Sequence, residues 1–166
     1  MSAFERHSEE RETIIDGQKW MVSWHGAGPS PQGKDHGAAG LCVTDTNCIV
    51  LITLDGEHWE VPGGRPEPGE NAEETLRREM MEEACVRVVR AKLIGYSRGT
   101  CLDGHEAGLI LVRSCWRAEV DLDNWAPRFE TKDRKIVSVA QALELLCNDS
   151  PYDRVYRRWF AEAQLV

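Results

Sequence analysis

The stretch Gly64–Val86, GRPEPGENAEETLRREMMEEACV, decides how this chain folds. Its first part, together with the preceding Pro62 and Gly63, is so rich in proline and glycine that regular secondary structure cannot begin there. Asn71 is a favourable N-cap residue, and Glu74 stands three residues later, where a capping box places its acid. The sequence therefore predicts a loop followed by a capped helix.

Three carboxylates point the same way on this predicted helix. Glu79, Glu82 and Glu83 fall within an arc of roughly 100°, because spacings of three and four residues return to one helix face. Like charges this close repel one another, so a positive group is expected among them, either Arg78 or a hard cation such as Mg²⁺ or Mn²⁺. A solvated acidic face is the alternative for an arbitrary glutamate-rich helix. The adjacent apolar stripe, predicted to pack against the protein body, is Ala72, Leu76, Met80 and Ala84.

The spacing of this stretch resembles the Nudix box of Nudix hydrolases. Cys85 departs from the signature, since the family usually has glycine there. The resemblance implies an α/β (α+β) fold, a Nudix-type α/β/α sandwich with a mixed β-sheet, and the order of predicted strands and helices fits such layers. The matched positions are Gly64, Glu70, Arg78, Glu79, Glu82, Glu83 and Val86.

The same resemblance implies a chemistry. Nudix hydrolases typically cleave the diphosphate linkage of nucleoside diphosphate derivatives with water and a divalent metal ion, so Mg²⁺ (or Mn²⁺) and a small phosphorylated, nucleotide-like substrate are expected. Bound metal screens the pyrophosphate charges and lowers the pKa of a bound water. The metal ligands that the resemblance implies are Glu79, Glu82, Glu83, Glu70 and the carbonyl of Gly64. The catalytic residues that it implies are Glu82, Glu83, Glu79 and Arg78, with Arg78 orienting the glutamates through charge-assisted hydrogen bonds.

The general base and the base-stacking residue are predicted less directly. Glu82 or Glu83 is the first choice for the base, and Glu130 is the candidate outside the box. Trp125, which falls in a predicted loop, is the candidate for stacking on a nucleobase, since aromatic faces stack on bases. The alternative for Glu130 is an ordinary surface acid, and for Trp125 it is loop packing.

Cys85 is expected to stand at the end of the helix in a left-handed conformation. A residue other than glycine there costs on the order of 1 kcal/mol. The departure from the family signature therefore concerns local backbone geometry and leaves the predicted ligands in place.

Composition restricts the partners. With 166 residues the chain is long enough for one domain, and its formal net charge of −8 disfavours binding to duplex nucleic acid. No apolar run of about 18 residues is present, so no membrane span is expected. The six cysteines contain no Cys-x-x-Cys pair and follow no apolar signal segment, which is typical of reduced thiols in a cytoplasmic protein. The sequence leaves the oligomeric state open, a homodimer included.

The chain is divided into an arm and one domain. Residues 1–17 are polar and charged and are predicted to form a mobile or loosely docked N-terminal arm, before a single Nudix domain at 18–166. Within the domain, a hairpin is predicted from two strands, and two helices are predicted near the C-terminus. These strands are expected at 38–44 and 48–54, and the helices at 139–147 and 152–164.

Two classes of function compete. The first is a divalent-metal-dependent pyrophosphohydrolase of a nucleoside diphosphate derivative, with nucleoside triphosphates and ADP-ribose-like compounds both open. The alternative is a non-catalytic Nudix-fold module that binds nucleotides or regulates. Such a module is expected to have lost box acids, and this chain keeps all four, which favours the enzyme.

Overall fold

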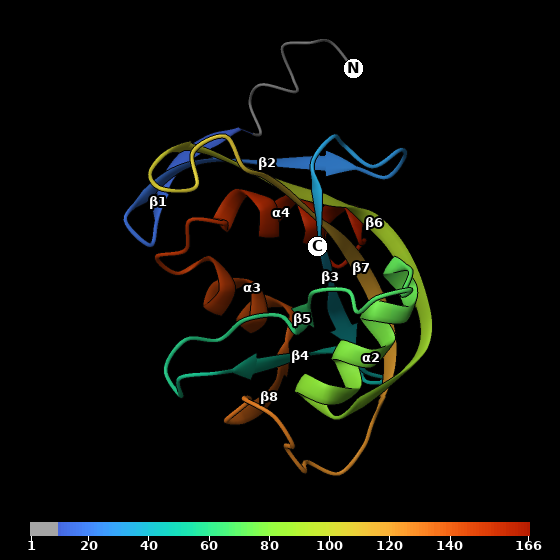
Figure 1. Ribbon diagram of the computed structural model, residues 1–166. Helices are drawn as coiled ribbons and strands as arrows, with labels where there is room; N and C mark the ends of the chain where they lie inside the picture. Colours follow the sequence, from blue (N-terminus) through green and yellow to red (C-terminus); the bar gives the residue numbers. More distant parts are fainter. Residues whose placement is uncertain (1–9) are drawn as a thin grey trace.

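The computed structural model describes residues 10–166 and arranges them as a sheet between helices (Figure 1). The strands are β1 (Arg11–Ile15), β2 (Gln18–Gly26), β3 (Lys34–Val43), β4 (Cys48–Thr53), β5 (Gly63–Gly64), β6 (Val86–Asp103), β7 (Ile110–Leu122) and β8 (Asp133–Ser138). The helices are α2 (Ala72–Ala84), α3 (Val139–Cys147) and α4 (Asp153–Glu162). The hairpin and both C-terminal helices predicted from the sequence are present.

The sheet of the described residues is mixed, as predicted. Its order is β1-β2-β6-β7-β3-β4-β8, and the short β5 pairs with β3 away from this path. β3 and β7 run parallel, whereas the other neighbouring strands are antiparallel. Because β3 pairs with β4 only at Cys42 and Val43, its first half is free to pair with β5 instead. The sheet therefore splits at β3, and the Gly63–Gly64 strand enters the gap.

Two apolar cores lie on opposite faces of this sheet. One core includes the buried side of α2, formed by Leu76, Met80 and Ala84, and the other includes Trp159 and Phe160 of α4. Figure 1 shows α2 on one side of the sheet and α3 with α4 on the other. This confirms the predicted α/β/α layering, in which burial of both sheet faces requires helices on both sides. None of the helices within residues 10–166 has the length and apolar composition needed to span a membrane.

The prediction of a loosely docked arm at 1–17 is wrong for its last part. Arg11–Ile15 form β1, which pairs with β2 along its whole length, and Arg11 Nη1 donates to Asp153 Oδ1 of α4 at 2.5 Å. The reason is the turn Asp16-Gly17, in which both residues have positive φ, 50° and 75°. Asp-Gly is a strong signal for a two-residue hairpin turn, and it outweighs the polar composition. Residues 1–9 lie outside the described part of the chain.

Helix α2 begins and packs as its sequence predicts. The Asn71 side chain accepts from Glu74 N at 2.9 Å, and Glu74 Oε1 accepts from Asn71 N at 3.2 Å, so the capping box is complete. Three of the four predicted stripe residues are fully buried. Ala72 is the exception, because the first helical position is exposed, and Thr75 is buried there instead. The buried stripe fixes which face of α2 carries its glutamates.

Helix α2 ends in the left-handed residue expected at Cys85. Its φ and ψ are 52° and 47°, and its amide donates to Met81 O at 3.1 Å. The side chain is only 6% exposed. Cys85 therefore adopts the left-handed conformation that usually favours glycine.

Exchanging Cys85 is expected to separate the cost of this conformation from the packing of the thiol. Cys85→Gly and Cys85→Ala both remove the sulfur, but only alanine keeps the Cβ that crowds a left-handed backbone. We expect the glycine variant to have the higher free energy of unfolding by about 1 kcal/mol. Urea unfolding of both variants measures this difference. Equal stability, or greater stability of the alanine variant, contradicts a strained Cβ at this position.

Candidate functional site

The acids of α2 are brought to the backbone of β5. Gly63 N donates to Glu83 Oε1 at 2.7 Å, and a Cβ placed on Gly64 would overlap the carboxylate of Glu79. β5 is itself fixed, because it pairs with β3 and because Gly40 N donates to Pro62 O at 3.1 Å. Glycine at 64 thus allows a carboxylate to lie directly against the main chain.

Arg78 holds together three of the four glutamates that match the box signature. Its guanidinium donates to both oxygens of Glu70 at 2.7 and 2.9 Å, to Glu79 Oε1 at 2.8 Å and to Glu82 Oε2 at 3.0 Å. The Arg78 side chain is 20% exposed, so these contacts are shielded from bulk water. The hydrogen bonds from Arg78 lower the pKa of Glu70 to about 2, and those to Glu70 and Glu79 raise the pKa of Arg78. The contact predicted between Arg78 and the glutamates is present.

Glu70 is held by hydrogen bonds on both oxygens. Besides Arg78, its Oε1 accepts from Glu67 N at 2.7 Å and from Thr75 Oγ1 at 3.1 Å. These contacts favour a role in positioning Arg78 over direct coordination of an ion. The ligand role predicted for Glu70 stays a prediction.

Glu83 is the acid that Arg78 does not contact. Its pKa is raised to about 7, mainly by burial and also by the charges of Glu79 and Glu60, while the hydrogen bond from Gly63 N opposes the rise. Negative charge is therefore concentrated on this side of α2 beyond what Arg78 balances. Carboxylate oxygens and a nearby backbone carbonyl are the donor set that Mg²⁺ and Mn²⁺ prefer.

The glutamate side chains are arranged around Arg78 in this structure. Within residues 10–166, no three His, Cys, Asp or Glu side chains converge closely enough to coordinate one ion. Glu79 Oε1 and Glu82 Oε2 instead share one nitrogen of Arg78, while Glu83 bonds to Gly63. The residues fit a divalent cation in type and charge, and coordination requires these side chains to turn toward one another.

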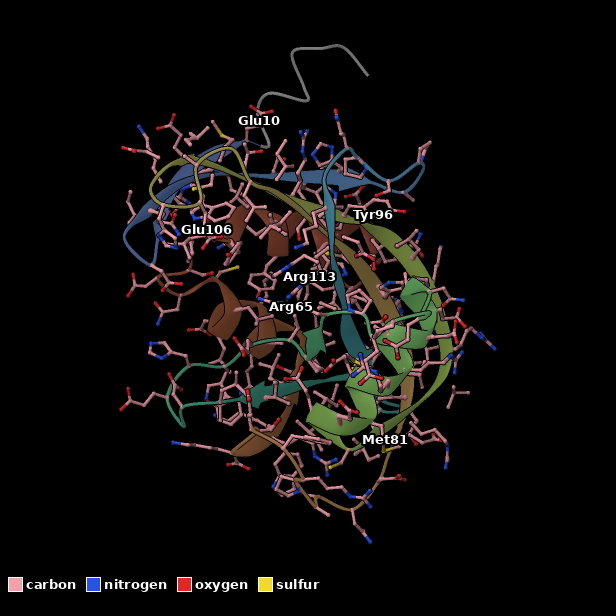
Figure 2. The ribbon with its side chains drawn as sticks, viewed as in Figure 1. Glu10, Arg65, Met81, Tyr96, Glu106 and Arg113 are labelled. Atoms are coloured by element: carbon pink, nitrogen blue, oxygen red, sulfur yellow. The ribbon has the colours of Figure 1, made fainter. Side chains whose placement is uncertain are left out.

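Sequence reasoning missed charged residues on the other side of β5. Arg113 of β7 is half-buried; burial raises the pKa of Glu60 and of Glu83 and lowers that of His36, and the charge of Arg113 opposes the first two shifts and adds to the third. Figure 2 labels Arg113 and Arg65 in the middle of the view. The available signal was a single charge inside the apolar run of residues 109–116, and an arginine in such a run is rarely buried without a partner.

Glu130 and Trp125 lie outside the box and outside the strands and helices of the described residues. Both belong to the segment between β7 and β8, which is attached at the end of α2 through Asp123 N, a donor to Cys85 O at 2.9 Å. The guanidinium of Arg134 lies 5.4 Å from the centre of the Trp125 ring. Glu130 is exposed. Within residues 10–166, neither side chain forms a hydrogen bond or ion pair with Gly63, Gly64 or the α2 glutamates, and both roles stay predictions.

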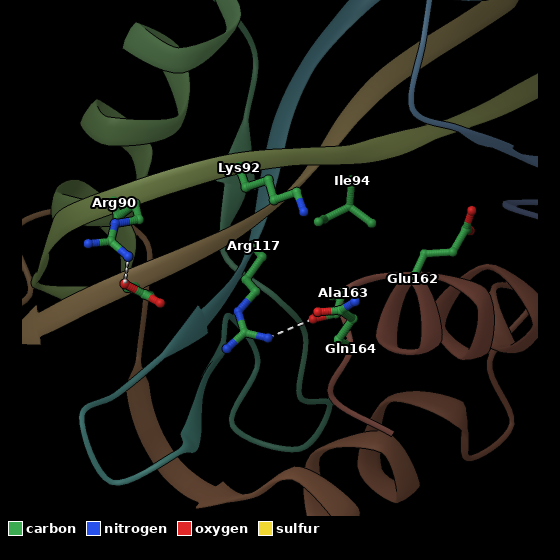
Figure 3. Close-up of a pocket in the computed structure, with 8 residues that line it drawn as sticks. Arg90, Lys92, Ile94, Arg117, Glu162, Ala163 and Gln164 are labelled. Carbon is green, nitrogen blue, oxygen red and sulfur yellow. Dashed lines mark hydrogen bonds and ion pairs between the residues drawn. The ribbon is translucent and has the colours of Figure 1, made fainter.

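A pocket of about 280 Å³ beside the end of α4 is separate from this group (Figure 3). Most of its charged side chains already have partners within the protein. Arg117 Nη1 donates to Ala163 O at 2.6 Å, and Arg90 pairs with Glu119 at 3.6 Å. None of the box residues lines it. The box glutamates therefore remain the candidate site.

Comparison with known proteins agrees with the fold and the box. The family model described as NUDIX domain matches residues 34–160, which include β3, the box, α3 and most of α4. The chain belongs to the NUDIX family.

Similar proteins and structures point the same way. Over 60 residues, the chain is 37% identical to a protein of Bacillus subtilis (strain 168) provisionally named 8-oxo-dGTP diphosphatase, and this match spans 36% of the chain and 40% of that relative. The chain thus covers less than half of that protein's length. A pyrophosphohydrolase of Bacillus subtilis, solved as a mutant, has a TM-score of 0.68 at 22% identity and covers 93% of this chain and 96% of its own. The NUDIX domain of Shewanella oneidensis NrtR, in complex with ADP ribose, has a TM-score of 0.57 at 16% identity, with 82% and 90% covered.

Proposed function

We propose that this protein is a divalent-cation-dependent pyrophosphohydrolase acting on a nucleoside diphosphate derivative. The observation that carries the proposal is the placement of Glu79 and Glu83 directly against the Gly63–Gly64 backbone, with more negative charge than Arg78 balances. A purely structural acidic face would remain in solvent, because burying a carboxylate beside two others without a counter-charge costs free energy. Membership in the NUDIX family supports the same reaction.

Each box residue has a part in this reaction. Arg78 holds Glu79 and Glu82 in position, and Glu70 in turn holds Arg78 through both of its oxygens. The Gly63 amide keeps one oxygen of Glu83 in place, which leaves the other oxygen available as a ligand or base. Mg²⁺ or Mn²⁺, when bound by the box glutamates and the Gly64 carbonyl, screens the pyrophosphate charges and lowers the pKa of a bound water.

Glu82 or Glu83 remains our proposal for the general base. Both belong to the helix that carries the other acids, and a base must lie within hydrogen-bond reach of the attacking water. Glu130 follows the segment that is attached at Cys85, at the end of α2 that carries Glu82 and Glu83, and it stays our candidate outside the box. Trp125 is in the same segment, and one face of its ring is already covered by Arg134.

The substrate is proposed at the level of a class. A relative carries the name of an 8-oxo-dGTP diphosphatase, and a structural neighbour holds ADP ribose. Nucleoside triphosphates, among them 8-oxo-dGTP, and ADP-ribose-like compounds are therefore the first compounds to test.

The proposal is tested by a product assay over this panel. The wild-type protein is incubated with each compound and Mg²⁺ or Mn²⁺, and the released phosphates are separated and identified. We expect cleavage of at least one compound at its diphosphate linkage, and loss of that activity in excess EDTA, followed by recovery when Mg²⁺ is restored. Activity that persists in EDTA rules out the metal-dependent reaction. Binding of a compound without its cleavage supports the non-catalytic module instead.

A further inference from the structure

Strand β3 contains a bulge opposite Arg113. In the parallel ladder of β3 and β7, Asp35 pairs with Val112 and Ala38 pairs with Ser114, so two residues of β3, His36 and Gly37, stand opposite the single Arg113. The Gly37 amide donates to Asp35 Oδ1 at 2.9 Å, and Ser114 Oγ donates to Gly37 O at 3.3 Å. Bulges bend a strand and change the direction of a side chain, and they are frequent beside active sites.

The other side of this bulge lies against the box. Ala38 pairs with Gly64, and a Cβ on Gly37 would overlap the carbonyl oxygen of Gly64 and lie 2.9 Å from the Cα of Arg65. Arg113, the bulge and Arg65 therefore follow one another across three neighbouring chain segments. Glu79 and Glu83 contact the same two glycines from the side of α2. Arginines and box glutamates thus flank a common piece of backbone.

The guanidinium of Arg113 has donors to spare. Within residues 10–166 its side chain forms no hydrogen bond and no ion pair, although it is half-buried and its charge acts on Tyr152 and Tyr156 as well as on Glu60, Glu83 and His36. Burial of His36, together with the charges of Arg113, Arg65 and Lys34, lowers the pKa of that imidazole, which favours its uncharged form. A half-buried guanidinium with five N–H donors and no acceptor is typical of a site for an anionic ligand.

Resting on the proposed function, we infer that Arg113 binds a phosphoryl group of the substrate beside the α2 glutamates, with the exposed Arg65 as a second contact. The planar fork of arginine matches two phosphoryl oxygens at once. The glutamates and the arginines then divide the work, because the acids hold the metal and Arg113 holds a phosphate directly. A substrate whose phosphate chain reaches both groups is favoured over a monophosphate.

The inference is tested with inorganic pyrophosphate as the probe and the full-length chain. Arg113→Ala removes the guanidinium, and Arg113→Lys keeps its charge but removes the fork. Arg90→Lys is the control, since Arg90 is an exposed arginine on the neighbouring strand β6. Pyrophosphate affinity is measured by calorimetry in Mn²⁺ and by NMR shifts in EDTA. Binding of Mn²⁺ alone is measured separately by electron paramagnetic resonance.

We expect Arg113→Ala to weaken pyrophosphate binding roughly tenfold to a hundredfold, because hydrogen bonds to a charged group are lost. Arg113→Lys is expected to lose part of this affinity, Arg90→Lys none, and Mn²⁺ binding is expected to stay unchanged in all three. Pyrophosphate affinity within about twofold of wild type in a folded Arg113→Lys or Arg113→Ala protein overturns the inference. Absence of Mn²⁺ binding by the wild type instead counts against the proposed function, and the EDTA titration then still decides on Arg113.

Discussion

Replacing Glu83 by glutamine is expected to lower kcat by about a thousandfold, with the fold retained. Metal-ion catalysis supplies several kcal/mol, and each 1.4 kcal/mol corresponds to about a factor of ten in rate. Glutamine has the size of glutamate and can still accept the hydrogen bond from Gly63 N through its own Oε1. It also removes the repulsion from Glu79 and Glu60, so the unfolding midpoint is not expected to fall. Glu82→Gln is expected to give a similar loss of kcat.

A matched control lies on the same helix. Glu73 in the first turn of α2 is exposed and pairs with Arg77 at 3.2 Å, away from Gly63 and Gly64. Glu73→Gln removes the same charge from α2, and its kcat is expected to stay within about twofold of wild type. Steady-state kinetics on the best substrate of the panel, with urea unfolding of each variant, make the comparison. If Glu82→Gln and Glu83→Gln are as active as Glu73→Gln, the proposed role of the box glutamates is wrong.

Gly37→Ala is expected to lower the free energy of unfolding by about 3 kcal/mol or more. The residue has a φ of 106°, and a Cβ there would overlap the carbonyl oxygen of Gly64. The carbonyl of Gly64 is part of the backbone and cannot change rotamer as a side chain can, so β3 and β5 must separate to accommodate the new Cβ. Conformational strain and overpacking each contribute roughly 1 to 3 kcal/mol. Because β5 carries the contacts to Glu79 and Glu83, activity is expected to fall as well.

Gly17→Ala is the control that separates the steric clash in Gly37→Ala from the conformational strain of a positive φ. Gly17 also has a positive φ, 75°, but a Cβ there meets nothing within 4 Å. Its variant is expected to lose only about 1 kcal/mol, the cost of alanine in a left-handed conformation. Urea unfolding of the two alanine variants measures the difference between them. A Gly37→Ala protein as stable as Gly17→Ala would mean that β3 and β5 are not packed as closely as described here.

The sequence by itself determined the parts of the fold that depend on neighbours along the chain. The capping box of Asn71 and Glu74, the left-handed Cys85 and the shared face of Glu79, Glu82 and Glu83 all follow from spacings of a few residues. Arg78 and Glu82, which form a hydrogen bond, are likewise separated by one helical turn. Such features are local, so they can be predicted from the sequence alone. The missed strand β1 was also local, since the Asp16-Gly17 turn was present in the sequence.

Only the tertiary structure decided which residues from distant parts of the sequence surround the glutamates. Arg113 is 30 residues after Glu83 and His36 is 47 residues before it, and the pairing of β3 with β5 and β7 brings them to one place. That pairing depends on the split of the sheet at β3, and a shift of one residue in register would turn Arg113 to the opposite face. Glu130 and Trp125 stay predictions, since their segment is attached to Cys85 beside Glu82 and Glu83 but neither side chain bonds to these glutamates. Residue type and spacing determined which acids share one face of α2. Strand register determined which residues lie around them.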